Sequence, residues 1–288
     1  IPVENRATTT SHPHVPASET AMASLRVLGL QEDLVWQDPE VNRISLASRI
    51  EEELAKSPAD VVVLPEMFTT GFSMSIEHVE RLDEEGLSAT SRWMLQLASQ
   101  HHVAITGSVA VRDLQGASFN RMWFATPEGD LHTYDKRHLF TLASEHENYT
   151  AGRGRVEVLW RGWRILLQIC YDLRFPGFVR NHGSQPYDLA LYVANWPEPR
   201  REAWRILLQA RAIENQCFVV GVNRSGSDAN GHRYAGDSLV FDHAGEALAD
   251  AGGDGQPTTL RATLAREDML TFRRKLPFLN DADRFGVR

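Results

Sequence analysis

The chain has 288 residues, 42% of them hydrophobic, which is enough for one large domain with a substantial core. Its formal net charge is −8, and its acidic and basic residues are interspersed, so it has no basic stripe of the kind that a nucleic acid backbone requires. No apolar run approaches the length of about 18 residues that a membrane span needs. We therefore expect no nucleic acid partner and no membrane role.

The cysteines and the first residues set the context of the fold. Two cysteines, Cys170 and Cys217, are too few for a disulfide framework, which predicts a protein of a reducing compartment, the cytoplasm. Residues 1–21 are rich in Pro, Thr and Ser and lack the apolar segment of a signal peptide. We expect 1–21 to be an added or disordered leader. Because no Gly-, Ser- or Pro-rich linker follows, we expect 22–288 to form a single domain.

Short aliphatic or β-branched runs alternate with helical segments along the first half of the chain, which is typical of an α/β protein. The expected elements, in order, are a strand at 25–31, an amphipathic helix at 42–57, a buried strand at 60–66, a helix at 91–102, a strand at 102–111 and two strands within 118–136. A Pro-Glu-Gly-Asp turn joins the last two.

The second half repeats this alternation. Its expected elements are a hairpin at 155–170 that turns at Arg161 and Gly162, a strand at 188–196, a helix at 201–215, a strand at 217–224 and a hairpin at 237–250. Strand, helix and strand pair thus recur in both halves. This pattern predicts two similar α-β-β units whose sheets pack face to face with the helices outside.

Three segments place a reactive residue just after an apolar run: VVLPEMF with Glu66, TYDKRHLF with Lys136 and LQICYDLRF with Cys170. Since ligands gather at the carboxyl ends of strands, the three residues are expected to converge in one pocket. A thiolate nucleophile at Cys170 would be favoured by Lys136 and by the amides of a helix that begins there. The same donors would face an oxyanion, and Glu66 would be the general base of an acyl transfer.

Other interpretations of these residues compete with this one. A cysteine after an apolar run is often a small buried hydrophobe, and we adopt that interpretation for Cys217, to which we assign no function. In a rival mechanism, His138 or His146 pairs with Cys170 in a cysteine–histidine dyad. The eleven histidines form no HExxH motif and no paired CxxC is present, so we expect no metal and no cofactor.

The segments PEMFTTGF, YDKRHLF and CYDLRFP, in this order, resemble the three catalytic boxes of the nitrilase superfamily, the carbon-nitrogen hydrolases with a Glu-Lys-Cys triad. The segments ALYVANWP and RAIENQCFVVGVNR extend the resemblance, which spans the chain from about Leu25 to the C-terminal strands. It implies a four-layer α-β-β-α sandwich of two similar halves and hydrolysis of a C–N bond through a cysteine thioester. A small amide and water would be the partners of the enzyme, which would form a homodimer.

Within that superfamily, CYDLRFP together with NRSG and GDS resembles the omega-amidases, which hydrolyse the side-chain amide of 2-oxo acid monoamides such as 2-oxoglutaramate. The resemblance also implies a second pocket glutamate seven residues before a glycine. Glu145 precedes Gly152 by that spacing, and Glu147 lies near enough to be an alternative.

The expected substrate-binding residues are Tyr171, Arg174 and Trp196, which flank the presumed pocket. An acidic substrate needs a cation for its carboxylate, and Arg174 offers a bidentate match. Nitrile hydrolysis, carbamoyl hydrolysis and N-acyl transfer use the same triad and are alternative activities. A non-catalytic binding protein on the same fold is the alternative from another functional class.

Overall fold

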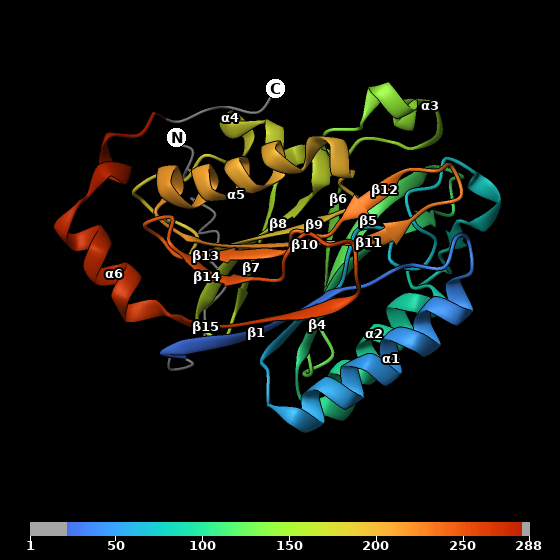
Figure 1. The fold of residues 1–288 in the computed structure, drawn as a ribbon, viewed down its shortest axis with the longest axis horizontal. Helices are drawn as coiled ribbons and strands as arrows, with labels where there is room; N and C mark the ends of the chain where they lie inside the picture. Colours follow the sequence, from blue (N-terminus) through green and yellow to red (C-terminus); the bar gives the residue numbers. More distant parts are fainter. Residues whose placement is uncertain (1–21, 284–288) are drawn as a thin grey trace, which may run out of the picture.

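The computed structural model describes residues 22–283, so the leader expected at 1–21 lies outside the described residues, as do residues 284–288. Two β-sheets lie face to face in the middle of the molecule, and helices cover their outer faces (Figure 1). This arrangement is the α/β four-layer sandwich that the resemblance implied. Within the described residues, every helix is too short or too polar to cross a lipid bilayer.

The first sheet has seven strands in the order β15-β1-β2-β4-β5-β6, with β3 beside β4. β1, β2 and β4 are mutually parallel, whereas β15, β5 and β6 run antiparallel to their neighbours. Parallel strands are buried on both faces, which explains the uninterrupted Val-Val-Val of β2. The bounds are Ser24–Gln31 (β1), Val61–Val63 (β2), Glu80–Arg81 (β3), Ala104–Arg112 (β4), Ser118–Ala125 (β5), Leu131–Asp135 (β6) and Thr258–Ala265 (β15).

The second sheet has six strands in the order β14-β13-β10-β9-β8-β7. β8, β9 and β10 are parallel, and β7, β13 and β14 are antiparallel to their neighbours. The bounds are Val156–Trp160 (β7), Trp163–Ile169 (β8), Leu189–Ala194 (β9), Phe218–Asn223 (β10), Leu239–Phe241 (β13) and Ala247–Asp250 (β14).

The two sheets share one pattern of strand directions. From β15 to β6, successive pairs are antiparallel, parallel, parallel, antiparallel and antiparallel, and the same series is found from β7 to β14. In this correspondence β1 matches β8, β2 matches β9 and β4 matches β10. The two similar halves expected from the sequence are thus present in the fold.

Three long helices form the outer layers. α1 and α2 lie over the first sheet and α5 over the second (Figure 1). The side chain of Asp38 caps α1 by accepting a hydrogen bond from Val41 N, and Ser88 opens α2 with a capping box. Along α5, Trp204 and Leu208 recur at the four-residue spacing of one buried face. The bounds are Pro39–Lys56 (α1), Ala89–His101 (α2) and Arg201–Asn215 (α5).

The remaining elements are shorter. β15 and the helix α6 that follows it were not expected from the sequence, and neither was the β11–β12 hairpin. The bounds are Glu145–Asn148 (α3), Pro176–Val179 (α4), Arg266–Lys275 (α6), Ser225–Ser227 (β11) and Arg233–Ala235 (β12), with 3₁₀ helices at Ile76–His78 (η1), Thr141–Ala143 (η2), Cys170–Arg174 (η3), Glu198–Arg200 (η4) and Phe278–Asp281 (η5).

A continuous apolar core fills the space between the sheets. Val27, Val63 and Met122 from the first sheet pack into one cluster with Ile165 and Val220 from the second. A separate cluster lies between the first sheet and α1 and α2. Burial contributes about 1.5–3 kcal/mol for each such side chain, so these cores fix the strand ends on which the site is built.

Candidate active site

Cys170 lies directly after β8, at a strained turn. Its φ is 44°, in the left-handed region that residues other than glycine seldom occupy. The helix expected to begin here is a single short 3₁₀ segment, η3, which α4 follows. The side chain of Cys170 is half-buried and lines a pocket, whereas Cys217 is fully buried in the apolar core, beside Arg211 of α5.

Glu66 lies three residues after the end of β2, in the loop that leaves this strand, and is fully buried. Its Oε1 accepts hydrogen bonds from Lys136 Nζ at 2.9 Å and from Asn120 Nδ2 at 2.8 Å. Its Oε2 accepts one from the backbone N–H of Asn195 at 2.8 Å. Asn195 Nδ2 also donates to the Glu66 carbonyl at 2.6 Å, so the carboxylate is held from both sheets.

Lys136 follows β6, and its ammonium lies between two buried carboxylates. Its Nζ is 2.9 Å and 3.0 Å from the two carboxylate oxygens of Glu145, in addition to its contact with Glu66. Glu147, the alternative to Glu145, is exposed to solvent. At Gly152, a Cβ atom would lie 2.0 Å from the carbonyl oxygen of Asp135, so this position must be glycine for the chain to pass beside the lysine.

The charges of this cluster shift the pKa values of its members. Burial lowers the pKa of Lys136, but the carboxylates of Glu145 and Glu66 raise it by more, and the net pKa lies above its ordinary value. Burial and the nearby Glu66 raise the pKa of Glu145, although Lys136 opposes them. The ammonium therefore stays charged and is shared between two carboxylates.

The thiol of Cys170 differs from the sequence-based expectation. Burial and the negative charge of Glu66 raise its pKa well above the ordinary value, and Lys136 offsets this only in part. Lys136 favours the thiolate, as expected, but burial and the carboxylates of Glu66 and Glu145 outweigh it, so the expected net lowering of the thiol pKa was wrong. A base must therefore remove the thiol proton, and the carboxylate of Glu66, which is close enough to raise the pKa of that thiol, is placed to do so.

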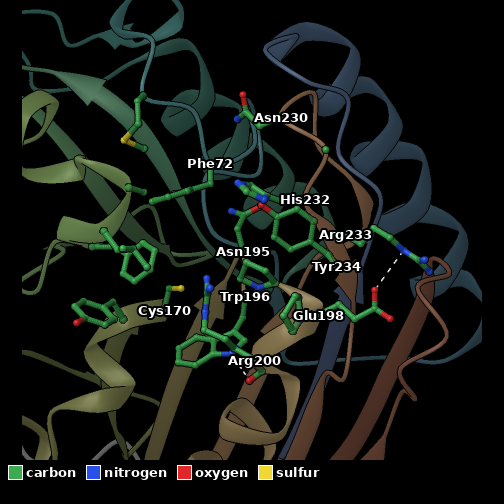
Figure 2. Close-up of a pocket in the computed structure, with 18 of the residues that line it drawn as sticks. Phe72, Cys170, Asn195, Trp196, Glu198, Arg200, Asn230, His232, Arg233 and Tyr234 are labelled. Carbon is green, nitrogen blue, oxygen red and sulfur yellow. Dashed lines mark hydrogen bonds and ion pairs between the residues drawn. The ribbon is translucent and has the colours of Figure 1, made fainter.

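The pocket above Cys170 has a volume of about 570 Å³. Figure 2 shows the sulfur of Cys170 directed towards the space between Asn195 and Trp196 on one side and Phe72 on another, with Tyr234 across from it. The wall includes three arginines, Arg174, Arg200 and Arg233, the last of which forms an ion pair with Glu198 at 3.3 Å.

The three expected substrate-binding residues all line this pocket. The guanidinium carbon of Arg174 lies 5.0 Å above the ring of Trp196, and the indole N–H of Trp196 donates to the carbonyl of Arg200 at 2.8 Å. The ring of Tyr171 contacts that of Phe140 edge to face, with centroids 5.0 Å apart. The three residues expected from the sequence thus lie in one wall of the pocket, which also contains Arg200 and Phe140.

The histidines named in the rival mechanism are placed differently. Nδ1 of His138 lies 2.7 Å from the carboxylate of Asp172, and its ring stacks on Phe175. His146 is exposed on α3. Within residues 22–283, no cluster of three or more His, Cys, Asp or Glu side chains has the arrangement of a metal site.

Sequence reasoning missed Asn120 and Asn195, which hold Glu66 in place. Asn195 stands at a strand end, in ALYVANW, and this position is the signal that could have identified it. Asn120 lies inside β5, where its neighbours in the sequence give no such signal. Its pairing with two glutamates depends on contacts between residues far apart in the chain.

Comparison with known proteins gives close relatives. Residues 24–274 match the carbon-nitrogen hydrolase family. The omega-amidase YafV of Escherichia coli K12 is 46% identical over 266 residues, covering 92% of this chain and 100% of that protein. The 2-oxoglutaramate amidase of Bacillus subtilis is 38% identical over 254 residues, covering 88% of this chain and 95% of that protein.

Solved structures agree with these matches. XC1258 from Xanthomonas campestris, a CN-hydrolase superfamily protein with an arsenic adduct in its active site, has a TM-score of 0.86 and 43% identity, covering 93% of this chain and 100% of that one. Nit3 of Saccharomyces cerevisiae, a member of the nitrilase superfamily, shares the fold with a TM-score of 0.80 at 23% identity, covering 91% and 97% of the two chains. The chain therefore belongs to the carbon-nitrogen hydrolase family, within the nitrilase superfamily.

Proposed function

We propose that the protein is an omega-amidase, which hydrolyses the terminal amide of a 2-oxo dicarboxylic acid monoamide such as 2-oxoglutaramate and releases ammonia. The observation that carries this proposal is the cluster of Glu66, Lys136 and Cys170 at the base of a pocket whose wall contains arginines. The relatives named omega-amidase and 2-oxoglutaramate amidase support the same reaction.

In the proposed first step, Glu66 takes the proton of the Cys170 thiol as the sulfur attacks the amide carbon. A C–S bond forms, and the resulting oxyanion is stabilised by Lys136, a contribution of about 3–4 kcal/mol for a well-placed donor. The C–N bond then breaks, and Glu66 passes its proton to the nitrogen, which leaves as ammonia. A thioester on Cys170 remains.

In the second step, Glu66 takes a proton from water while the water oxygen attacks the thioester. The C–S bond breaks, the carboxylic acid product leaves, and the proton returns to the sulfur. Both carboxylate oxygens of Glu145 accept hydrogen bonds from the ammonium of Lys136 and so keep it in position through both steps. No other reactant is needed.

The charges of the pocket wall support an acidic substrate. Arg233 is paired with Glu198, whereas Arg174 and Arg200 have no carboxylate partner among residues 22–283 and instead lie over the rings of Trp196 and Phe140. An unpaired guanidinium beside an aromatic ring suits a bidentate contact with a carboxylate. We propose Arg174 as the main carboxylate ligand, with Tyr171 and Trp196 positioning the chain of the substrate.

The test compares 2-oxoglutaramate with pentanamide and pentanenitrile, which match its length but lack the acid. Because binding energy at the remote carboxylate positions the amide, kcat/KM from ammonia release should be at least about 100-fold higher for 2-oxoglutaramate. Arg174→Gln should remove most of this preference, while Arg274→Gln, at an exposed arginine of α6, should not. A preference for the neutral amide or the nitrile would reject the omega-amidase proposal and leave the thioester mechanism standing.

We further propose that 22–288 forms a single carbon-nitrogen hydrolase domain. In support, the first and last strands of the described chain pair along their whole length, with Ser24 opposite Ala265. The two sheets also share one apolar core.

We also propose a cytoplasmic homodimer that binds neither nucleic acid nor membrane. Both cysteines are free thiols, which suits a reducing compartment, and the net charge is −8. Ile206 and Ile213, seven residues apart on α5, are 61% and 51% exposed and offer an apolar face for the second copy. Light scattering should give the mass of a dimer, and Ile206→Glu with Ile213→Glu should give that of a monomer. A wild-type monomer would contradict this assembly.

A further inference from the structure

Asp172, two residues after Cys170, is fully buried and accepts four hydrogen bonds. Its Oδ2 accepts from the backbone N–H of Ile169 at 3.1 Å and from the hydroxyl of Tyr134 at 2.7 Å. Its Oδ1 lies 3.0 Å from the backbone nitrogen of His138 and 2.7 Å from the Nδ1 atom of the same residue. One carboxylate thus joins two segments that lie far apart in the chain.

The positions of these donors relate Asp172 to the reactive residues. Ile169 immediately precedes Cys170, so the Ile169–Asp172 contact closes the turn in which Cys170 has its φ of 44°. Tyr134 and His138 stand two residues before and two residues after Lys136. The carboxylate therefore accepts hydrogen bonds from the residue that precedes the nucleophile and from residues on both sides of the lysine.

We propose that Asp172 is a positioning residue that holds the strained turn of Cys170 in register with Lys136. It acts through these two residues, since it is buried behind Cys170 and is not part of the pocket wall. The inference rests on the proposed role of Cys170 as nucleophile but not on the choice of substrate. A turn in the left-handed region persists only where its surroundings stabilise it, and Asp172 supplies that stabilisation.

The site requires two acceptor oxygens, which an amide cannot provide. The backbone N–H of Ile169 faces Oδ2 and that of His138 faces Oδ1, and both groups can only donate. In Asp172→Asn, the NH₂ group would meet one of these donors in either orientation of the side chain. The variant would thus break the connection on the Cys170 side or on the Lys136 side while keeping the volume of the side chain.

The role of His138 follows from the same contacts. Because a carboxylate only accepts hydrogen bonds, the ring proton of His138 is on Nδ1, and this N–H donates a hydrogen bond to Asp172. The ring is fixed by stacking on Phe175, with centroids 3.8 Å apart, and by an edge contact with Phe178. His138 thus supports Asp172 and does not act as the base for Cys170.

The test measures two quantities in Asp172→Asn: steady-state ammonia release, and the rate at which iodoacetamide alkylates Cys170, located by mass spectrometry. A misplacement of about 1 Å can lower a rate 100-fold, so we expect kcat to fall about 100-fold with KM within threefold of wild type. The alkylation rate should fall at least fivefold. Since alkylation needs no substrate, it remains informative even if the omega-amidase proposal fails.

Asp188→Asn is the matched control. Asp188 is also buried and accepts from a backbone N–H, that of Arg164, and from Arg266, but it lies at the opposite end of β9 from Asn195. It should lower the melting temperature without changing the alkylation rate of Cys170. The inference would be overturned if a folded Asp172→Asn variant had a Cys170 alkylation rate within twofold of wild type, or if it behaved as Asp188→Asn does.

Two milder variants keep the test decisive if Asp172→Asn does not fold. Tyr134→Phe and His138→Ala each remove one side-chain donor to Asp172 and leave both backbone donors in place. Each should lower kcat and the alkylation rate together by about threefold to tenfold, with KM unchanged. Alkylation within 20% of wild type in both variants would refute the positioning role.

Discussion

The two halves of the molecule share a strand pattern but differ in the connection between their first two parallel strands. In the first half, β1 is joined to β2 through α1, a helix of 18 residues. In the second half, β8 is joined to β9 through η3, of five residues, and α4, of four. Cys170 occupies the start of that shorter connection. The comparison indicates that the nucleophile lies where the second half departs from the first.

The halves also contribute different chemistry to one site. The first half supplies the buried charges of Glu66 and Lys136, and the second supplies the thiol of Cys170 and the amide of Asn195. Glu66 follows β2, and Asn195 follows β9, the strand that matches β2 in the second sheet. The ends of these two corresponding strands therefore meet, and Asn195 after β9 positions the base, Glu66, after β2.

Removing the thiol tests the second half's contribution and should have the largest effect. Cys170→Ala deletes the nucleophile and little volume, so turnover should fall by about 10⁴-fold or more with the fold intact. Cys217→Ala, a matched change in the core, should leave turnover within about twofold. Ammonia release with circular dichroism distinguishes these outcomes. Equal losses in the two variants, or substantial turnover by Cys170→Ala, would contradict the assignment.

Glu66→Gln tests the first half's contribution. Gln keeps the shape of the side chain but cannot take the thiol proton, so kcat should fall by about 10²–10⁴-fold. Mass spectrometry of the variant mixed with substrate should show little thioester on Cys170. If Glu66→Gln kept its activity while His138→Ala and His146→Ala lost theirs, the cysteine–histidine dyad would be preferred.

Glu145→Gln and Glu147→Gln form the sharpest pair, because the two residues lie on one turn of α3. Glu145 is buried against Lys136, whereas Glu147 is exposed. Losing one of the two carboxylates that hold the lysine should lower kcat by about tenfold to 100-fold, since the stabilising cation is less well fixed. Glu147→Gln should match wild type. The reverse result would place the second pocket glutamate at Glu147.

Much of the fold could be predicted because its signals are local. The helix expected at 201–215 is α5, and the turn expected at Arg161 and Gly162 has the positive φ angles of 48° and 78° that suit a two-residue hairpin. β15 and α6 were missed. β15 is half exposed and alternates Thr and Arg with apolar residues, so only its pairing with β1 identifies it as a strand.

The electrostatics of the site could not be predicted in the same way. The sequence placed Glu66, Lys136 and Glu145 in one pocket with Cys170, but it did not show that both carboxylates contact the lysine ammonium. Pairing between Glu66, Lys136 and Glu145 spans up to 79 positions of the chain and depends on strand ends that meet only after folding. The thiol pKa is raised chiefly by burial and by Glu66, which together outweigh Lys136, and this balance could not be predicted from the residues alone.

The smallest expected effect concerns the pKa of Cys170 itself. Burial and Glu66 raise this pKa, and Glu145 raises it further, so the thiol should remain protonated at neutral pH. Only the thiolate reacts with iodoacetamide, and a group whose pKa is raised gains that form only at higher pH. The alkylation rate of the wild type should therefore still be rising at pH 9. Glu145→Gln removes a negative charge that helps to raise the thiol pKa, so the variant should have a lower thiol pKa and faster alkylation at pH 7 even as turnover falls. An alkylation rate that levels off below pH 7 in the wild type would show instead that Lys136 dominates and that the thiolate is already formed.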